Sequence, residues 1–434
     1  MPALLYEPTN LEGKVPAVIN LNGHDRDLGK AIPFKQRRCI ALAKRGMLAL
    51  SPEWFGMGEL DWRIYNHGQA AGLDLCGRSS VGLHYLAVRQ ALDVLLEHPH
   101  ADPERVALTG LSGGGWQTIV VSSLDDRVSA AVPVAGYVDI RTRVRTGKDM
   151  GDLEQAPVDL LTIADYSHLT AMLFPRAALL VFNAYDECCF AAHRARPSVY
   201  EPVRAVYDRY APGVEFSFHE NFDPGSHNYQ LNNRLAFYGF LNRNFVALED
   251  RVEGEPSSEG EIRSFDELRI QTAYRKRRFE ELALDLAKDL PCRKKAELEG
   301  SPEARVAVRK ELREVLHLRS APVTDVLRDS AEVFGDFEVM ALRVRLSNLV
   351  TIPVYALTPK SSSPVGTVLL FADGGRASIA DRVHEALRNG MRVLAFDVLF
   401  SGECAGPEGG AMLARTFGRR ALGDQVAQVQ AVAA

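Results

Sequence analysis

Short apolar runs alternate with amphipathic stretches along the first half of the chain. Residues 17–23 (AVINLNG) are typical of a strand, 34–46 (FKQRRCIALAKRG) of a helix that ends at a glycine, and 47–54 (MLALSPEW) of the next strand. The alternation continues with helices at 84–98, after Ser112 and at about 230–245, and with strands at 106–110, 129–136, 177–183 and 214–221. Continuous apolar strands that are mostly followed by helices predict an α/β fold with a mostly parallel, doubly wound sheet covered on both faces.

A polar, irregular stretch at residues 137–172 interrupts this alternation and is longer than an ordinary connection. Two interpretations are open. The segment is either a lid over a site or a helical excursion without a role of its own.

The composition changes after residue 247. Residues 248–261 are acidic and rich in Ser, Gly and Pro, which is typical of a linker, and the stretches at 270–290 and 303–318 are charged with helical periodicity. Their acidic residues largely offset their basic ones, so they favour bridging helices over a nucleic-acid arm. We therefore predict a first domain at 1–247 and a linker with bridging helices at 248–330.

The end of the chain repeats its beginning. PALLYEP (2–8) matches PVYALTP (353–359), and GMLALSPEWFGMGE (46–59) matches GMRVLAFDVLFSGE (390–403) in the same order. The repeat predicts a partial second α/β domain of the same type at 331–434. Because the first copy starts almost on its equivalent strand and the second stops early, we expect both ends to be cut from a longer protein. The open sheet edge would then favour association into a homo-oligomer.

Composition and charge exclude several classes of partner. With 46% hydrophobic and 25% charged residues and a formal net charge of -5, the chain has no bias toward nucleic acid or an anionic membrane. It has no apolar run of about 18 residues and no signal peptide, so as given it is expected to be cytoplasmic; the compartment of the parent protein stays open. The six cysteines have no zinc-site spacing and are interpreted as reduced thiols.

The stretch Gly110, Leu111, Ser112, Gly113, Gly114 carries the first candidate chemistry. It fits GxSxG, with a strand before it and a helix after it, which is the context of a nucleophile elbow. A sharp turn exposes the serine hydroxyl, and side chains at the flanking glycines would collide with the neighbouring chain. No lysine follows the glycines and no dinucleotide-binding spacing continues beyond them, so phosphate-binding motifs are set aside.

A serine hydroxyl needs a base, and the base needs an orienting carboxylate. In this strand order the acid follows a late strand and the histidine follows the last one. Asp186 follows the strand 177–183 and His227 follows the strand 214–221, so both are candidates. Glu187 and Asp139 are alternative acids, whereas histidines before the elbow do not fit the order.

The oxyanion that forms during acyl transfer needs two donors. The backbone N–H of Gly113 is one candidate, and that of His24, in the NGHD loop after the strand 17–23, is the other. The alternative is that this loop is a turn without a role. Trp54, Phe55 and Trp116 are candidates to line a substrate pocket, with packing in the core as the alternative.

The motifs GLSGGG, NGHD, NAYDECCF and DPGSHNY together resemble the α/β-hydrolase superfamily over residues 1–245, most of all its acetyl xylan esterase-like and dienelactone hydrolase-like branches. The resemblance implies a triad of Ser112, Asp186 and His227 and hydrolysis of carboxylic esters, with acyl groups on plant polysaccharides among the candidate substrates. The chain departs from the usual pattern in having NGH where HG is more common, which leaves in doubt the side chains that tune the oxyanion loop.

We therefore expect a metal-independent serine esterase that needs no cofactor, works through an acyl-enzyme and acts on a small-molecule or carbohydrate ester. A prolyl-oligopeptidase-like peptidase shares this triad order, but such enzymes normally carry a propeller domain that this chain lacks. A non-catalytic module that binds carbohydrate or a partner, with a vestigial Ser112, is the alternative from another class.

Overall fold

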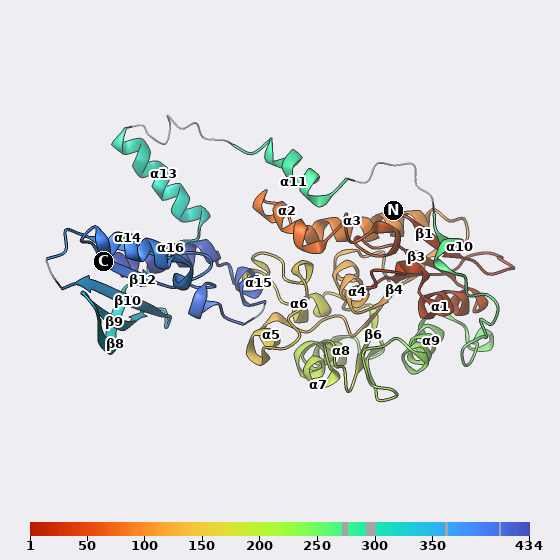
Figure 1. The fold of residues 1–434 in the computed structure, drawn as a ribbon. Coiled ribbons are helices and arrows are strands. Elements are labelled where there is room, and N and C mark those ends of the chain that lie inside the picture. The colour runs from red at the N-terminus through yellow and green to blue at the C-terminus, as the bar shows by residue number, and fades with distance from the viewer. Residues whose placement is uncertain (271–276, 292–300, 361–362, 408) are drawn as a thin grey trace. The chain divides into compact units, whose positions relative to one another are not determined.

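The apolar runs of the first half form one seven-stranded sheet in the computed structural model, which describes residues 1–270, 277–291, 301–360, 363–407 and 409–434 (Figure 1). The strand order is β1-β3-β2-β4-β5-β6-β7; β1 pairs antiparallel with β3 and all other pairs are parallel. The predicted mostly parallel α/β sheet is therefore confirmed. Its strands are β1 (Ala3–Tyr6), β2 (Val15–Leu21), β3 (Leu48–Pro52), β4 (Ala101–Leu111), β5 (Ala130–Val134), β6 (Ala177–Asn183) and β7 (Phe216–Asn221).

Helices cover both faces of this sheet. Successive side chains of a strand point to opposite faces, so Ile19 of β2 packs in the cluster that contains Leu92, while its neighbour Asn20 accepts a hydrogen bond from Arg38 on the other face. The helices of this part are α1 (Pro33–Lys44), α2 (Ala71–Leu75), α3 (Ser80–Leu96), α4 (Gly113–Leu124), α5 (Ile140–Thr146), α6 (Tyr166–Ala171), α7 (Ala192–Ala195), α8 (Glu201–Tyr210), α9 (Leu231–Phe245), α10 (Phe265–Leu268) and α11 (Phe279–Ala287).

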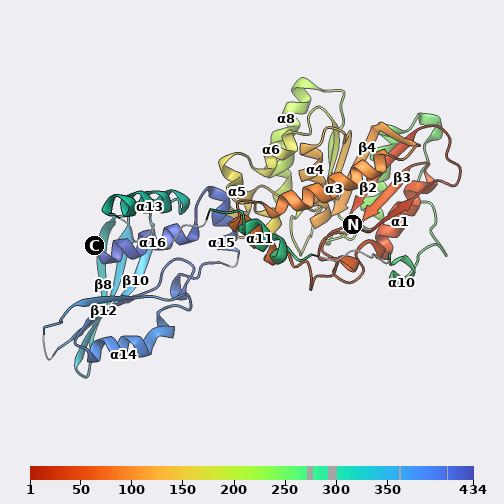
Figure 2. The ribbon, with the colours of Figure 1, turned by 90° about the horizontal axis from the view of Figure 1, so that it is seen from above.

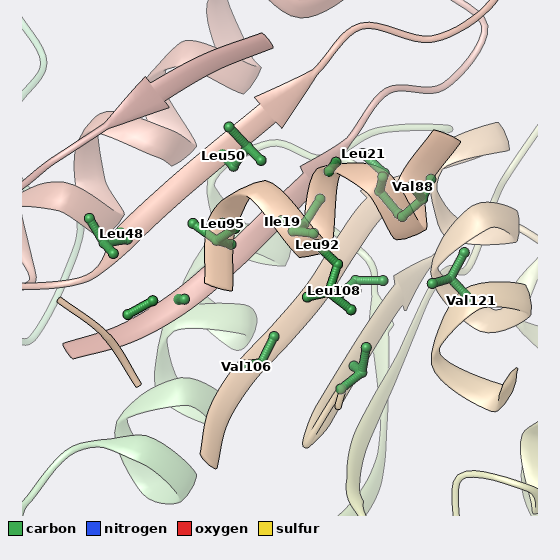
Figure 3. Packing of buried hydrophobic residues seen from close by; sticks show 14 residues of the cluster. Ile19, Leu21, Leu48, Leu50, Val88, Leu92, Leu95, Val106, Leu108 and Val121 are labelled. Atoms are coloured by element: carbon green, nitrogen blue, oxygen red, sulfur yellow. The ribbon is translucent and has the colours of Figure 1, made fainter. Parts of the chain in front are cut away.

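A hydrophobic cluster of buried side chains lies between α3 and the strands β2, β3 and β4 (Figure 3). Val88, Leu92 and Leu95 recur at helical spacing on one side of α3, and they meet Leu108 of β4 and Val121 of α4. Burial of these side chains fixes α3 against the strand that leads into Ser112, so this core positions the candidate site.

A second, five-stranded sheet follows in residues 323–396. Its order is β11-β12-β10-β9-β8, and helices α14 and α16 cover its two faces (Figure 2). The strand predicted at 336–348 is β9, whereas β8 before it was not predicted. The elements are α13 (Pro302–Val315), β8 (Val323–Phe334), β9 (Phe337–Leu346), β10 (Thr351–Pro359), β11 (Thr367–Leu370), α14 (Ala380–Arg388), β12 (Arg392–Phe396), α15 (Gly410–Ala414) and α16 (Ala421–Ala433).

The two sheets share a topology that supports the internal repeat. In the first, β1 runs antiparallel to β3, which is parallel to β2; in the second, β10 runs antiparallel to β12, which is parallel to β11. The acidic residue that follows β3 and the one that follows β12 also make the same contacts. Glu53 accepts a hydrogen bond from the Lys30 N–H at 3.0 Å, and Asp397 accepts one from the Arg376 N–H at 2.6 Å. Both basic side chains pair with those same carboxylates.

The chain divides into two compact units, Met1–Leu290 and Pro291–Ala434. The segment predicted as a bridge at 248–330 is divided between them: α11 packs on α2 through Phe279 and Ala283, and α13 is part of the second unit. The boundaries 1–247, 248–330 and 331–434 stay predictions, and residues 271–276 of the predicted helical stretch lie outside the described residues. No helix in the described part of the chain has the length and apolarity needed to cross a membrane.

Candidate active site

Ser112 lies on a sharp turn between β4 and α4. Strand β4 ends at Leu111, α4 begins at Gly113, and Ser112 between them has a φ of 58° and a ψ of -121°. A positive φ is unusual for a residue with a side chain and is typical of strained functional turns. A Cβ at Gly110 would come within 2.7 Å of the Leu21 carbonyl oxygen, and one at Gly114 within 2.6 Å. The predicted collision at both glycines is therefore present.

His227 and Asp186 are directly hydrogen-bonded. The Nδ1 atom of His227 lies 2.8 Å from Oδ2 and 3.1 Å from Oδ1 of Asp186. The carboxylate is buried, and its Oδ1 also accepts the backbone N–H groups of Cys188 and Cys189 at 3.1 and 3.0 Å. Burial lowers the pKa of His227, but the hydrogen bond and charge of Asp186 outweigh it, so the pKa lies above its ordinary value of 6.5.

The two alternative acids have other roles in this geometry. The Glu187 carboxylate accepts the backbone N–H of His227 at 3.1 Å, so it contacts the histidine through the main chain. Asp139 accepts the Thr142 N–H at 2.9 Å and caps the start of α5. Of the three candidate carboxylates, Asp186 is the one that meets the imidazole.

A network of asparagines that the sequence analysis missed supports this pair. The Oδ1 atom of Asn183, at the end of β6, accepts hydrogen bonds from the side chains of Asn221, Asn228 and Asn233 at 3.0, 3.3 and 2.8 Å. Its Nδ2 atom donates to Oδ2 of Asp186 at 3.3 Å. Asn183 and Asn221 are register partners at the ends of adjacent strands. Their position at two predicted strand ends is the sequence feature that could have identified them.

The NGHD loop lies against the serine turn. A Cβ on Gly23 would meet the Leu111 carbonyl oxygen at 2.4 Å, the Ser112 Cβ at 3.3 Å and the Gly113 nitrogen at 3.4 Å. Gly113 is the first residue of α4, where backbone N–H groups have no partner within the helix. The loop is also a tight turn, because the Asp25 N–H donates to the Gly23 carbonyl at 2.8 Å.

Ser112 and His227 line one cavity of about 350 Å³. It opens where β2, β4, β6 and β7 end, as ligand sites in parallel sheets generally do. Within residues 137–172, Gly151, Asp152 and Gln155 form part of its wall. Other lining residues include Gly23, His24, Arg26, Phe34, Lys35, Trp62, Cys188, Cys189 and Phe190.

The aromatic residues chosen from the sequence do not line this cavity. Trp54 and Trp116 are buried, and their indole N–H groups donate to His84 Nδ1 and to the Tyr166 hydroxyl, each at 2.8 Å. Phe55 packs with Tyr65, His84 and Phe279. Trp54 and Trp116 are core residues because a buried indole needs a hydrogen-bond partner, which core positions supply. Trp62, which the sequence analysis missed, lines the cavity instead.

His24 belongs to a buried polar group beside the serine turn. Its Nε2 atom lies 3.2 Å from Oε1 of Glu154, and Nδ1 of His67 lies 3.3 Å from Oε2. Burial lowers the pKa of His24, but Glu154 and Asp152 outweigh it and the pKa is raised. Burial raises the pKa of Glu154, but the two histidines lower it well below its usual range. Neither His67 nor Glu154 was selected from the sequence.

Cys188 and Cys189 bring two thiols to the cavity wall. Their Sγ atoms lie 3.2 Å apart, and both are free cysteines. The hydrogen bond from Cys189 lowers the pKa of Cys188 to about 6; burial opposes this change and the nearby His227 favours it. Cys188 therefore carries thiolate character beside the candidate base.

Comparison with known proteins matches part of the chain to an esterase family. The family model described as acetyl xylan esterase (AXE1) matches residues 1–153, which confirms the resemblance inferred from the motifs. The protein named "Putative hydrolase YtaP" from Bacillus subtilis (strain 168) is 24% identical over 200 residues, which cover 43% of this chain and 65% of that protein. The chain thus spans less than two thirds of this relative.

Solved structures with a similar arrangement include two esterases. "Methylesterase BT1017" has a TM-score of 0.47 at 21% identity, covering 71% of this chain and 64% of that one. A carbohydrate esterase family 15 glucuronoyl esterase from Caldicellulosiruptor kristjansonii has a TM-score of 0.41 at 15% identity, covering 59% and 75%.

Proposed function

We propose that this chain, which has an α/β-hydrolase fold and matches the acetyl xylan esterase model over residues 1–153, is a serine hydrolase of carboxylic esters. One observation supports this most. Ser112, on its strained turn, lines the same cavity as His227, whose Nδ1 is hydrogen-bonded to the buried carboxylate of Asp186. A hydroxyl, an imidazole and a buried carboxylate are the parts that acyl transfer through a serine requires.

In the first half of the reaction, Ser112 Oγ attacks the ester carbonyl and His227 Nε2 accepts the hydroxyl proton. Asp186 holds the proton on Nδ1, so Nε2 keeps the lone pair that takes the serine proton. The tetrahedral intermediate then expels the alcohol, which takes the proton from His227. The acyl group stays on Ser112.

In the second half, water attacks the acyl-enzyme with His227 as base, and the carboxylic acid leaves as Ser112 recovers its proton. The negative oxygen of both tetrahedral intermediates is assigned to the backbone N–H groups of Gly113 and His24. The close approach of Gly23 to Ser112 and Gly113 supports this assignment, because it brings the loop that carries His24 against the first turn of α4.

The cavity walls favour a carbohydrate ester as substrate. A volume of about 350 Å³ suits a small-molecule site. The wall combines the indole of Trp62, over which the Arg26 guanidinium lies at 4.0 Å, with the polar side chains of Asp152 and Gln155. An aromatic face and hydroxyl-binding polar groups are the features that a sugar ring uses. The match to the acetyl xylan esterase model supports an acetyl or similar short acyl group.

Labelling with a fluorophosphonate, followed by kinetics, tests the proposal. We expect the wild type to be labelled at Ser112 and Ser112→Ala to be unlabelled, with kcat on p-nitrophenyl acetate reduced by about 10⁶-fold. Ser122→Ala, in the same helix as Gly113, is the matched control and should label normally. A screen of acetylated xylan, feruloyl esters and a proline anilide then separates an esterase from a peptidase. A folded wild type that is neither labelled nor active would support the non-catalytic module.

A further inference from the structure

Three side chains with metal-binding atoms converge beside the oxyanion loop and are not used in the proposed ester hydrolysis. His24 comes from the loop after β2, His67 from a 3-10 helix at His67–Ala70, and Glu154 from a 3-10 helix at Leu153–Gln155. Two imidazoles and a carboxylate are a ligand set found in zinc sites.

The nearest separations among these atoms are close to those between the ligands of a tetrahedral ion, with each Glu154 oxygen facing a different histidine. The three nearest pairs are His24 Nε2 to Glu154 Oε1 at 3.2 Å, His67 Nδ1 to Glu154 Oε2 at 3.3 Å, and the two ring nitrogens at 3.4 Å. Ligand atoms about 2.0 to 2.1 Å from a tetrahedral zinc ion are about 3.3 to 3.4 Å from one another. The observed separations therefore leave room for an ion of that size between them.

The hydrogen bonds around the group show where its lone pairs point. Nε2 of His67 lies 2.8 Å from the Phe55 carbonyl oxygen and donates to it, so Nδ1 is the ring atom that is available to a metal ion. Nδ1 faces Glu154, whose side chain is 1% exposed. The two Glu154 oxygens face His24 Nε2 at 3.2 Å and His67 Nδ1 at 3.3 Å. A buried carboxylate needs a positive partner, either a proton held on the imidazoles or a metal ion in its place. A histidine anchored through a backbone carbonyl is the usual outer support of a metal ligand.

The fourth side of the group opens to the cavity. Oδ2 of Asp152 lies 3.5 Å from Nε2 of His24, and the Asp152 side chain is 52% exposed and lines the cavity. An ion held by the other three side chains would take this carboxylate or a solvent molecule as its fourth ligand.

We propose that His24, His67 and Glu154 bind a divalent zinc-type cation, with Asp152 or water completing a tetrahedral set. Imidazole nitrogens select zinc and similar transition ions over magnesium and calcium, which take oxygen ligands. The ion would act as a positioning element. By fixing the His24 ring it would hold the Gly23–His24 loop against Ser112; this consequence rests on the proposed function, whereas metal binding itself does not.

A second group near Ser112 makes the test specific. Donor atoms of Cys188, Cys189 and His227 also lie within 4.8 Å of one another. Zinc bound there would be held by thiolates and would block the candidate base. The experiment must therefore separate a site of nitrogen and oxygen ligands from one of sulfur ligands.

The test uses the full chain, stripped with a chelator and reloaded with Zn²⁺ or Co²⁺. Bound metal is measured by elemental analysis, affinity by competition with a chromophoric chelator, and ligand type by the visible and near-ultraviolet spectrum of the Co²⁺ form. The variants are His67→Gln and Glu154→Gln. The matched control is the double variant Cys188→Ser, Cys189→Ser. Thermal unfolding shows whether each variant is folded.

We expect one Zn²⁺ per wild-type chain and the d–d spectrum of tetrahedral Co²⁺ without thiolate charge-transfer bands. His67→Gln and Glu154→Gln should weaken binding by more than the roughly 10- to 100-fold that loss of an outer-shell partner costs, and the cysteine variant should bind like the wild type. The proposal is overturned if the wild type binds no stoichiometric metal, if folded Glu154→Gln binds like the wild type, or if binding disappears in the cysteine variant. None of these readouts depends on esterase activity, so failure of the proposed function would leave them interpretable.

Discussion

Nδ1 of His227 lies 2.8 Å from Oδ2 of Asp186, across 41 residues of sequence. The carboxylate is held independently of the histidine, since the backbone N–H groups of Cys188 and Cys189 and the side chain of Asn183 also bind it. Asp186 is thus an acceptor held by the turn after β6, and as an acceptor it keeps a proton on Nδ1 of His227.

The pH profile of ester hydrolysis should report this pair. His227 must be neutral to act as a base, and its pKa is raised above 6.5 mainly by Asp186, with Glu187 and Cys188 contributing in the same direction. Hydrolysis should therefore be lost as the pH falls through that raised value. Asp186→Asn should move the midpoint of kcat/KM to lower pH and reduce kcat by about 10⁴-fold.

Glu187→Gln is the matched control for that experiment, because Glu187 touches His227 only through the backbone N–H. It should shift the midpoint in the same direction by less and retain most of kcat. If Asp186→Asn left both the midpoint and kcat at their wild-type values, the assignment of Asp186 as the orienting acid would be wrong.

Gly23→Ala should damage catalysis with little effect on substrate binding. The new Cβ would lie 2.4 Å from the Leu111 carbonyl oxygen and 3.3 Å from the Ser112 Cβ, so the loop that carries the His24 N–H must move away. Loss of one oxyanion donor costs about 10²- to 10³-fold in kcat. Gly82→Ala, where a Cβ meets nothing within 4 Å, is the control. Steady-state kinetics on an aryl acetate that gave equal kcat for both variants would argue against an oxyanion role for this loop.

The parts of the fold and site that are local in sequence could be predicted. The strands and helices followed from their periodicity, and Ser112 from glycines that nothing larger could replace. Asp186 and His227 followed from strand order, because the ends of parallel strands lie at one edge of the sheet. Side-chain direction could not be predicted in this way. Trp54 follows the end of β3 and Trp116 follows the serine turn, and both are positions where pocket residues occur. Their indole N–H groups nevertheless donate to buried partners.

The group of His24, His67 and Glu154 could not be predicted from the sequence, for a different reason. Its members lie on three loops or short 3-10 helices with no periodic spacing between them. Only tertiary packing of residues 137–172 over the oxyanion loop brings Glu154 to the histidines. That stretch was ambiguous between a lid and an excursion, and its contribution of Gly151, Asp152 and Gln155 to the cavity wall favours a role at the site.

The core behind the elbow should carry much of the stability of the first unit. Leu92 of α3 is fully buried against β2 and β4, so Leu92→Ala should lower the free energy of unfolding by about 2 to 5 kcal/mol. Leu86 on the same helix is 55% exposed, and Leu86→Ala should change the free energy of unfolding by less than about 0.5 kcal/mol. Urea unfolding followed by circular dichroism measures both, and equal losses would contradict the packing in Figure 3.

Cys188 should be the most reactive cysteine of the described chain. Its pKa is lowered to about 6, so it is largely a thiolate at neutral pH, and it is exposed at the cavity wall. Burial raises the pKa of Cys39 to about 12, and the pKa of Cys189 is raised by its hydrogen bond with Cys188. At neutral pH a limiting amount of iodoacetamide should therefore modify Cys188 first, as peptide mass spectrometry would show.

Alkylation at that position should also inhibit ester hydrolysis. The added group would occupy the cavity beside His227, so the loss of rate should follow the modified fraction of Cys188 and should be slowed when the carboxylic acid product is bound. Cys188→Ser should keep its own rate during the same treatment, because a serine hydroxyl does not react with the reagent. Modification of Cys189 before Cys188, or full modification of Cys188 without loss of rate, would mean that this wall lies outside the path of the substrate.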